Sequence, residues 1–401
     1  MATFYYKVMN VSRKFEMGSL TASTKEEAAA ILQKRNLKIF SIKKEAKSVL
    51  FNRSIPVIEK ITFVRYLSTM LNSGISLGDG MVVLENEVRH PMMKKIIADV
   101  VYGLNQGQQL STIFVKYPSV FDRLFVTLTR AGEVSGTLAD SFSYLEEGLR
   151  AEYTLSQKIK GALLYPGIVF IAMIGIAILM FFFILPQIGK VFLNMNLPLP
   201  KATRLLFSTS IAISQYTFVV IFGLVATCLG LFLFLKSSRG KGFISAIISP
   251  APIVKTIMRQ VDLARFTRIF STLIRSAVPI TEALEIALDS LSWAHYRSMA
   301  KDLSEQIRKG KSMADTFRGQ KEFPSILTQM IATGEKSGTL DKTLADLATF
   351  YEQEVEESVK NATQLLEPLL MLLVGIGVGA VILSIISPLY SVVGSLQQVQ
   401  K

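Results

Sequence analysis

"AGEVSGTL", residues 131–138, returns as "TGEKSGTL" at residues 333–340, and this repeat indicates how the whole chain is organised. The stretch "TFVRYLSTMLNSGISL" (62–77) likewise matches "RFTRIFSTLIRSAVPI" (265–280) at an offset of 203 residues. Further along the chain the offset becomes 202. Because the matches extend over such a length, a long segment of the sequence is present in two copies.

Each copy has the pattern of a helical bundle. Between residues 57 and 160 the apolar residues recur with helical period, and the pattern breaks at "SGISLGDG", "RHP", "NQGQQLS", "KYPS" and "AGEVSG". These breaks predict about six helices, and the second copy repeats the plan. We therefore expect a first cytoplasmic bundle over residues 52–160 and a second over residues 236–366.

The repeated "GExSGTL" motif marks the last corner of each bundle. We expect Gly132 to end one helix with a positive φ angle, Ser135 and Thr137 to cap the next helix, and Gly136 to permit a close chain reversal. The equivalent residues of the second copy are Gly334, Ser337 and Gly338. Two roles stay open for Glu133 and Glu335, a hydrogen bond to turn amides and a contact with a partner protein.

Three long stretches carry no charged residue, between Lys160 and Lys190, between Arg204 and Lys236, and between Glu367 and Lys401. Each exceeds the roughly 20 residues that a helix needs to cross a bilayer. The alternative is a set of buried helices in a large soluble protein. We predict transmembrane helices at the following residues: 161–188, 211–235 and 367–390.

The distribution of Lys and Arg predicts the orientation in the membrane. Seven of these residues flank the cytoplasmic ends of the first two spans, whereas the loop between them, residues 189–210, carries three. That loop is expected to face outward, as is the C-terminal tail, residues 391–401. The first residues lack the apolar core of a signal peptide, so we expect the N-terminus to stay in the cytoplasm.

Residues 1–51 have the pattern of a small α/β module. Two strand-like stretches are followed by a helix, which begins with a capping box formed by Ser23 and Glu26, and then by a third strand-like stretch. This module has ten Lys and Arg against four Asp and Glu and so carries much of the net charge of +13. It has an ordinary solvated surface or binds anionic lipid or an acidic partner, whereas no pattern favours nucleic acid. The fold class is thus mainly α, with two homologous bundles, three membrane helices and this module.

No motif predicts catalysis, a cofactor or a metal ion. "GKS" at 310–312 lacks the glycine and the strand that precede a phosphate-binding loop, and it is better explained as the end of one helix and the start of the next. His90 and His295 are the only histidines, and neither has a carboxylate or nucleophile at a catalytic spacing. The single cysteine, Cys228, excludes a disulfide within the chain.

Several of these features together resemble the inner-membrane platform proteins of type II secretion and type IV pilus machines. They are the twice-used "F-x-R-x-(x)-S-T" helix, "GExSGTL", "LPLPKAT" in the outward loop, and the dipeptides Tyr165-Pro166 and Glu367-Pro368. The sequence departs from the family pattern at Ala277, where a glycine is usual, and at the turn "NVSRK" (10–14).

The resemblance implies a non-enzymatic scaffold in the bacterial inner membrane. Such proteins are thought to couple a hexameric cytoplasmic ATPase to the extraction of pilin or pseudopilin from the membrane, beside other components of the machine. A transporter or channel subunit is the alternative function, but apart from Cys228 and from Glu367 at the edge of the third span, the three spans contain no Asp, Glu, Lys, Arg, His or Cys. Whether a pilus, secretion or DNA-uptake system is served stays open.

Two features of the third span suggest contacts with other chains. Gly375 and Gly379 have the GxxxG spacing of closely packed membrane helices, and an isologous homodimer is our default assembly, with a larger ring as the alternative. Glu367 abuts this span, and the resemblance implies a positively charged N-terminal amine on the filament subunit that it would bind. The alternative is a surface acid beside a helix-starting proline, Pro368.

Overall fold

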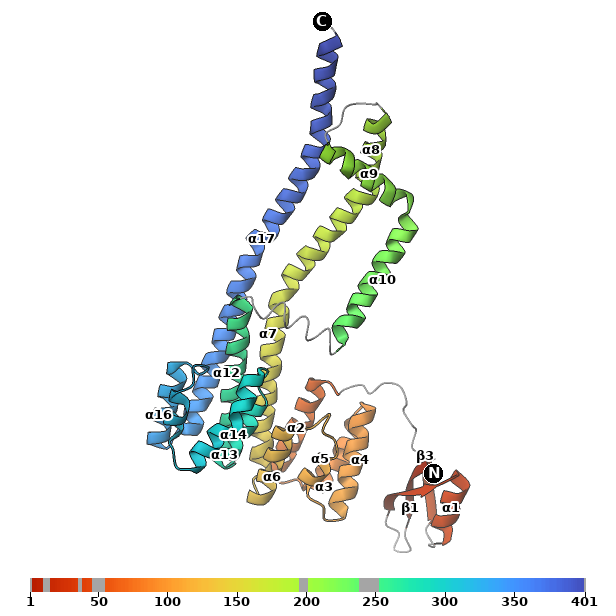
Figure 1. Cartoon of the computed structure of the whole chain (residues 1–401). Helices are drawn as coiled ribbons and strands as arrows, with labels where there is room; N and C mark the ends of the chain where they lie inside the picture. Colours follow the sequence, from red (N-terminus) through yellow and green to blue (C-terminus); the bar gives the residue numbers. More distant parts are fainter. Residues whose placement is uncertain are drawn as a thin grey trace. The chain divides into compact units, whose positions relative to one another are not determined.

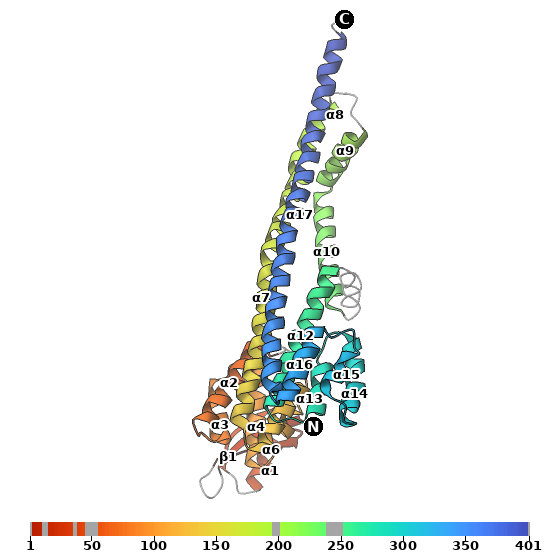
Figure 2. The same ribbon diagram turned by 90° about the vertical axis from the view of Figure 1, so that its left-hand side faces the viewer.

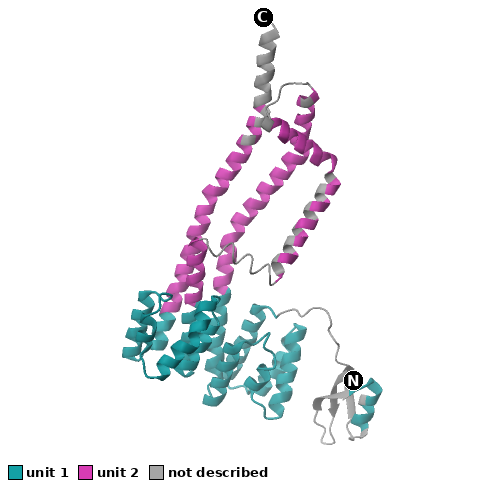
Figure 3. Ribbon diagram, in the orientation of Figure 1, with its two compact units in different colours: residues 1–153, 265–346 teal, residues 154–264, 347–401 magenta. Residues whose placement is uncertain are grey.

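The computed structural model describes residues 2–9, 15–34, 38–44, 55–194, 201–237 and 252–399. The protein is mainly helical, and it divides into two compact units. One unit comprises residues 1–153 and 265–346, and the other comprises residues 154–264 and 347–401 (Figure 3). Each unit therefore contains part of both sequence copies. The turn "NVSRK" and the prolines of "LPLP" (197–200) lie outside the described residues.

The N-terminal residues form a three-stranded antiparallel sheet and one helix. The sheet has the order β2-β1-β3, and its elements are β1 (Ala2–Met9), β2 (Phe15–Ala22), α1 (Lys25–Lys34) and β3 (Lys38–Lys44). The capping box lies one residue later than we expected. Thr24 Oγ1 accepts from the backbone N–H of Glu27 at 3.2 Å, and the Glu27 carboxylate accepts from the N–H of Ser23 at 2.7 Å.

The two sequence copies form matching series of helices (Figure 1). The first copy contains α2 (Val57–Asn72), α3 (Leu77–Glu87), α4 (Pro91–Asn105), α5 (Leu110–Phe114), α6 (Arg123–Ser135) and α7 (Leu138–Leu179). The second contains α12 (Pro252–Arg275), α13 (Ile280–Asp289), α14 (Ala294–Arg308), α15 (Met313–Arg318), α16 (Ser325–Ser337) and α17 (Leu340–Val399). The helices end at the Gly- and Pro-rich breaks, as the sequence predicted.

Aromatic rings fill the interior of each set of short helices. In the first copy the rings of Phe63, Phe114, Phe121 and Phe125 pack with centroids 4.3–6.3 Å apart. In the second copy Phe266, Phe317 and Phe323 occupy the positions of the first three rings, and Tyr296 joins them. All of these side chains are buried. Each copy therefore has its own apolar core.

The residue that departs from the family pattern adopts a strained backbone. Ala277 has a φ angle of 57° and is the only non-glycine residue with a positive φ among the described residues. Its equivalent in the first copy, Gly74, has a φ angle of 77°. A β-carbon disfavours this left-handed conformation, so the turn after α12 is more strained than the turn after α2.

Long helices follow the last corner of each copy (Figures 1 and 2). Helix α7 has 42 residues and α17 has 60, so each continues from the corner into the apolar stretch that follows it. Pro166 and Pro368 both lie inside these helices. Pro368 therefore does not start a helix, which one of the two alternatives for Glu367 had assumed.

The stretch that we expected to be an outward loop, residues 189–210, is largely helical where it is described. After α7 the chain passes through a π-helical turn, η1 (Met180–Ile184), into α8 (Leu185–Asn194), and α9 (Lys201–Gln215) follows. Proline at position 186 has no N–H for the carbonyl one turn earlier, which explains the π-helical turn. The rings of Phe192 and Phe207 stack 6.1 Å apart beside the buried Leu185 and join α8 to α9.

Two of the described helices are long and apolar enough to cross a membrane, Leu138–Phe192 and Leu340–Leu383. Only 6% and 0% of their most apolar windows are buried, whereas the core helix of a soluble protein is mostly buried. The described residues therefore favour membrane helices over the soluble alternative. A further apolar helix, α10 (Thr217–Lys236), overlaps the second predicted span, residues 211–235, whose first residues belong to α9. Helix α17 continues through most of the expected C-terminal tail.

Candidate functional site

The repeated corner motif lies where α6 meets α7 and where α16 meets α17. The chain turns at Gly136 and Gly338, whose φ angles are 74° and 70°. Our expectation that Gly132 ends the helix is wrong, because Gly132 lies inside α6 and its equivalent Gly334 lies inside α16. The sequence contains two glycines four residues apart, and only the second has the left-handed conformation of a helix C-terminus.

Gly132 and Gly334 serve close packing instead. A β-carbon on Gly132 would lie 2.6 Å from Ser141 Oγ, and one on Gly334 would lie 2.7 Å from Thr343 Oγ1. Contacts this short do not occur between real atoms, so a larger residue would displace the start of the long helix. Glycine is required at both positions because the first turn of α7 or α17 lies directly against it.

Glu133 binds the N-terminus of a short helix in its own copy. Its carboxylate accepts hydrogen bonds from the backbone N–H of Leu110, from the N–H of Ser111 at 3.1 Å and from the Ser111 hydroxyl. These are the first residues of α5, whose N–H groups have no partner within the helix. A carboxylate at this end is favoured by both the hydrogen bonds and the helix dipole.

Glu335 makes the same arrangement in the second copy. Its two carboxylate oxygens accept from the N–H groups of Met313 at 2.9 Å and Ala314 at 3.2 Å, at the start of α15. Between the two roles left open for these glutamates, the structure thus shows hydrogen bonds to backbone amides. The sequence could not identify those amides, because they lie more than twenty residues earlier in the chain.

The hydroxyl groups of the motif do not cap the following helix as we expected. Ser135 donates to the Ala131 carbonyl oxygen of its own helix at 2.7 Å, and its hydroxyl lies 2.6 Å from Thr137 Oγ1. In the second copy Ser337 bonds in the same way to Thr333 and Thr339. The hydroxyls therefore close the last turn of α6 and α16, and the motif as a whole is a rigid corner.

The "GKS" stretch also belongs to a corner. Gly310 has a φ angle of 86° just after α14, and Ser312 caps α15 by accepting from the N–H of Asp315 at 3.0 Å. Lys311 Nζ donates to Gln306 Oε1 at 2.8 Å. The explanation as a helix end followed by a helix start is confirmed, since these residues satisfy helix ends.

Tyr165 and Glu367 lie on the long helices at the start of the apolar stretches. The Tyr165 side chain is 57% exposed, and Glu367 is exposed too. Glu367 makes no hydrogen bond or ion pair with the other residues that the structure describes. Because Pro368 lies inside α17, a helix N-terminus does not account for this acid. It is available for a partner at the edge of an apolar helix.

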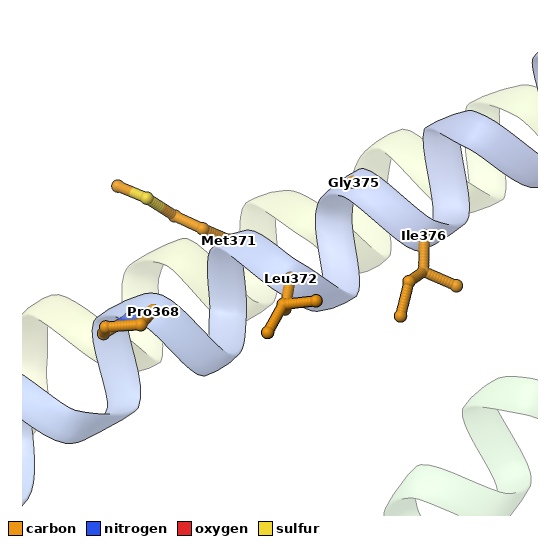
Figure 4. Close-up of a pocket in the computed structure, with 5 residues that line it drawn as sticks. All are labelled: Pro368, Met371, Leu372, Gly375 and Ile376. Atoms are coloured by element: carbon orange, nitrogen blue, oxygen red, sulfur yellow. The ribbon is translucent and has the colours of Figure 1, made fainter.

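The third predicted span carries a shallow apolar groove on α17 (Figure 4). The groove is lined by Pro368, Met371, Leu372, Gly375 and Ile376, and Figure 4 shows the side chains of Leu372 and Ile376 on the same side of the helix. No described atom outside the helix lies within 4 Å of the β-carbon positions of Gly375 and Gly379. Within the described part of the chain, these glycines are thus not used for packing.

The comparisons with known proteins match the duplicated architecture. The family model for the type II secretion system (T2SS) protein F matches twice, at residues 63–186 and 266–388. Type IV pilus assembly protein PilC of Thermus thermophilus is 29% identical over 404 residues, with 99% of each chain covered. The protein of that name from Myxococcus xanthus is 28% identical over 403 residues, with 99% of this chain and 96% of that one covered.

A secretion protein is also similar over the whole length. Type II secretion system protein F of Pseudomonas aeruginosa is 24% identical over 399 residues, with 98% of both chains covered. The two matches to the family model span more than half of the chain and coincide with its two helical copies. The chain therefore belongs to the family of type II secretion system protein F, which includes type IV pilus assembly proteins.

Proposed function

We propose that this protein is the inner-membrane assembly platform of a type IV pilus or type II secretion machine. It is a scaffold without enzymatic activity of its own. It receives motion from a hexameric cytoplasmic ATPase and passes that motion to pilin or pseudopilin subunits, which leave the membrane for a growing filament. Other inner-membrane components and membrane lipid are its further partners.

One observation carries this proposal. The rigid corner of each copy leads without a break into a helix that carries both polar residues and a long apolar stretch, α7 with 42 residues and α17 with 60. A helix rises about 1.5 Å per residue and resists bending, so a displacement of the short helices is passed along it. The close contact at Gly132 and Gly334 and the hydrogen bonds of Glu133 and Glu335 hold the short helices against the start of each long helix.

The proposal includes a membrane topology. Residues 161–188, 211–235 and 367–390 cross the inner membrane, the N-terminus lies in the cytoplasm, and the C-terminus lies outside. Two observations support it. The Lys and Arg residues gather on one side of the first two spans. The apolar windows of α7 and α17 are exposed, as expected for helices in lipid.

The ATPase partner is tested with purified proteins. We expect the platform alone to release no phosphate from ATP, and we expect it to bind its cognate ATPase and raise the turnover of that enzyme. A variant with Lys311→Ala is the matched control, because Lys311 bonds a glutamine of α14 and stands in a sequence that looks like the end of a phosphate-binding loop. Hydrolysis by the platform itself that persists in this variant would contradict the scaffold role. An unchanged ATPase rate together with absent binding would contradict the coupling.

A further inference from the structure

One face of the early helices is exposed in the first sequence copy, whereas the equivalent face of the second copy is buried. Helices α2 and α3 correspond to α12 and α13 at an offset of 203, and the core residues Met81 and Leu84 are buried just as Leu284 and Ala287 are. The other face of these helices differs. Two apolar residues of the first copy are about half exposed, whereas their equivalents in the second copy are buried.

The two positions are Tyr66 and Val83. Tyr66 is 45% exposed, whereas its equivalent Ile269 is 9% exposed. Val83 is 48% exposed, whereas its equivalent Ile286 is 2% exposed. The polar neighbour Thr69 is exposed too, although Thr272 in the second copy is buried. We call Tyr66, Thr69 and Val83, on the adjacent helices α2 and α3, the open face.

The matching face of the second copy is covered by α6 and α7 of the first copy. Arg123 pairs with Asp289 at 2.7 Å at one end of the contact. Near the other end Glu147 pairs with Arg275 at 3.1 Å, and Gly148 places a β-carbon position 3.7 Å from Thr272 Oγ1. The contact therefore joins the late helices of one copy to the early helices of the next.

This contact pairs a surface of the late helices with a different surface of the early helices. Because each copy has both kinds of surface, one surface of each kind stays without a partner within the molecule. The early helices of the first copy retain the open face. The equivalent positions in the second copy lie on α16 and α17, where Ser325, Thr349 and Phe350 replace Arg123, Glu147 and Gly148, and Phe350 is 37% exposed. An unlike pair of surfaces that recurs between copies joins molecules head to tail and produces a closed ring or an open chain.

We infer that α17 of a second copy of this chain covers the open face, so that molecules associate head to tail. This inference deepens the proposed function by assigning the surface through which platforms assemble. Phe350 supplies an aromatic ring for Tyr66 and Val83, and it also prevents the close approach that Gly148 permits. Charge is complementary as well, because the exposed Arg65 retains the position of Arg268, and Asp346 is exposed one turn before Phe350 on α17.

The experiment cross-links two differently tagged full-length molecules in membranes. Both carry Cys228→Ser, one also carries Tyr66→Cys, and the other carries Phe350→Cys. With a short bifunctional thiol reagent, we expect a cross-linked pair only when the two variants are mixed. Each variant treated alone is the control.

The possible outcomes separate the assemblies. A cross-link in the Tyr66→Cys sample alone would show an isologous contact and overturn the head-to-tail inference. Absence of any cross-link, in a protein that still forms oligomers, would assign the open face to a different protein and would overturn it too. Both outcomes leave the proposed function intact, because stimulation of the ATPase is measured separately on the same preparations.

A substitution at the open face tests the same surface through the molar mass of the oligomers in solution. Val83→Asp places a charge on a side chain that is already exposed, so folding is unaffected and self-association is expected to weaken about tenfold or more. Val134→Asp is the matched control, since Val134 on α6 is 78% exposed and lies outside the open face. Equal association of the two variants, measured by light scattering in detergent, would overturn the inference.

Discussion

Replacing Glu133 by glutamine tests whether the corner holds α5 in place. The change keeps the size of the side chain but removes its charge and one of its two acceptor oxygens, and it directs an N–H₂ group toward backbone donors. Both groups that depend on the carboxylate are buried, since Leu110 is 0% exposed and Ser111 is 1% exposed. Water therefore cannot replace the lost acceptor.

The size of the effect follows from the bonds that are lost. A hydrogen bond to a charged group contributes about 1.5–3 kcal/mol net, and glutamine keeps one neutral acceptor in place of two charged ones. We expect the local opening of α5 to become easier by about 2 kcal/mol. At about 1.4 kcal/mol per factor of ten, this corresponds to roughly thirtyfold faster amide exchange.

Hydrogen–deuterium exchange of the full chain in detergent measures this directly. Peptides that cover residues 106–116 are expected to exchange faster in Glu133→Gln, whereas peptides that cover residues 308–320 keep their rate and provide an internal control. Glu335→Gln is expected to give the reverse result. Unchanged exchange at residues 106–116 would refute the reasoning and would point to contact with a partner as the reason for the glutamate.

Three further predictions follow from single positions. Ala277→Gly is expected to raise the free energy of unfolding by about 0.5–1 kcal/mol, because glycine adopts the left-handed backbone conformation without strain. Gly74→Ala is expected to lower it by a similar amount, so the two variants should shift the thermal melting temperature in detergent in opposite directions. In a protein that carries Cys228→Ser, the variant Asn194→Cys should react with a membrane-impermeant thiol reagent added outside the cell, whereas Ser237→Cys should not. The reverse labelling would contradict the topology. Glu367→Gln is expected to abolish filament assembly at normal protein level and normal ATPase binding, because the carboxylate would lose a cationic amine of the filament subunit, and normal filament numbers in electron micrographs would leave Glu367 without that role.

The features that could be predicted from the sequence are the local and repeated ones. Glycine, proline and helical periodicity act over a few residues, and so the breaks between the short helices were recognisable. The choice between Gly132 and Gly136 was not, because it depends on how closely Ser141 approaches. The partners of Glu133 were not recognisable either, since a carboxylate on one helix can bind the end of any helix that the fold brings near it.

The helices α8 and α9 show a second limit. Residues 189–210 were predicted to face outward from the distribution of Lys and Arg, which does not indicate their secondary structure. Apolar residues spaced along two short segments can bury one another as a helical hairpin. Phe192 and Phe207 do so, and Gly189 leaves the space for the Phe207 side chain, whose Cβ atom would lie 2.9 Å from a β-carbon there. The charge distribution could not predict this pairing, because it depends on contacts between two separate segments.

The two kinds of contact in the first unit have different strengths. Inside each copy, buried phenylalanine side chains contribute about 1.5–3 kcal/mol each. Between the copies the ion pairs are largely exposed, as for Arg123 with Asp289, whose side chains are 54% and 45% exposed, and such pairs contribute about 0–1 kcal/mol each. These ion pairs therefore hold the copies together less firmly than the phenylalanine side chains hold each copy. The contact also buries Ile269 and Ile286, and such a small apolar contact with exposed ion pairs suits head-to-tail association, because it can form within one molecule and between molecules without either core having to rearrange.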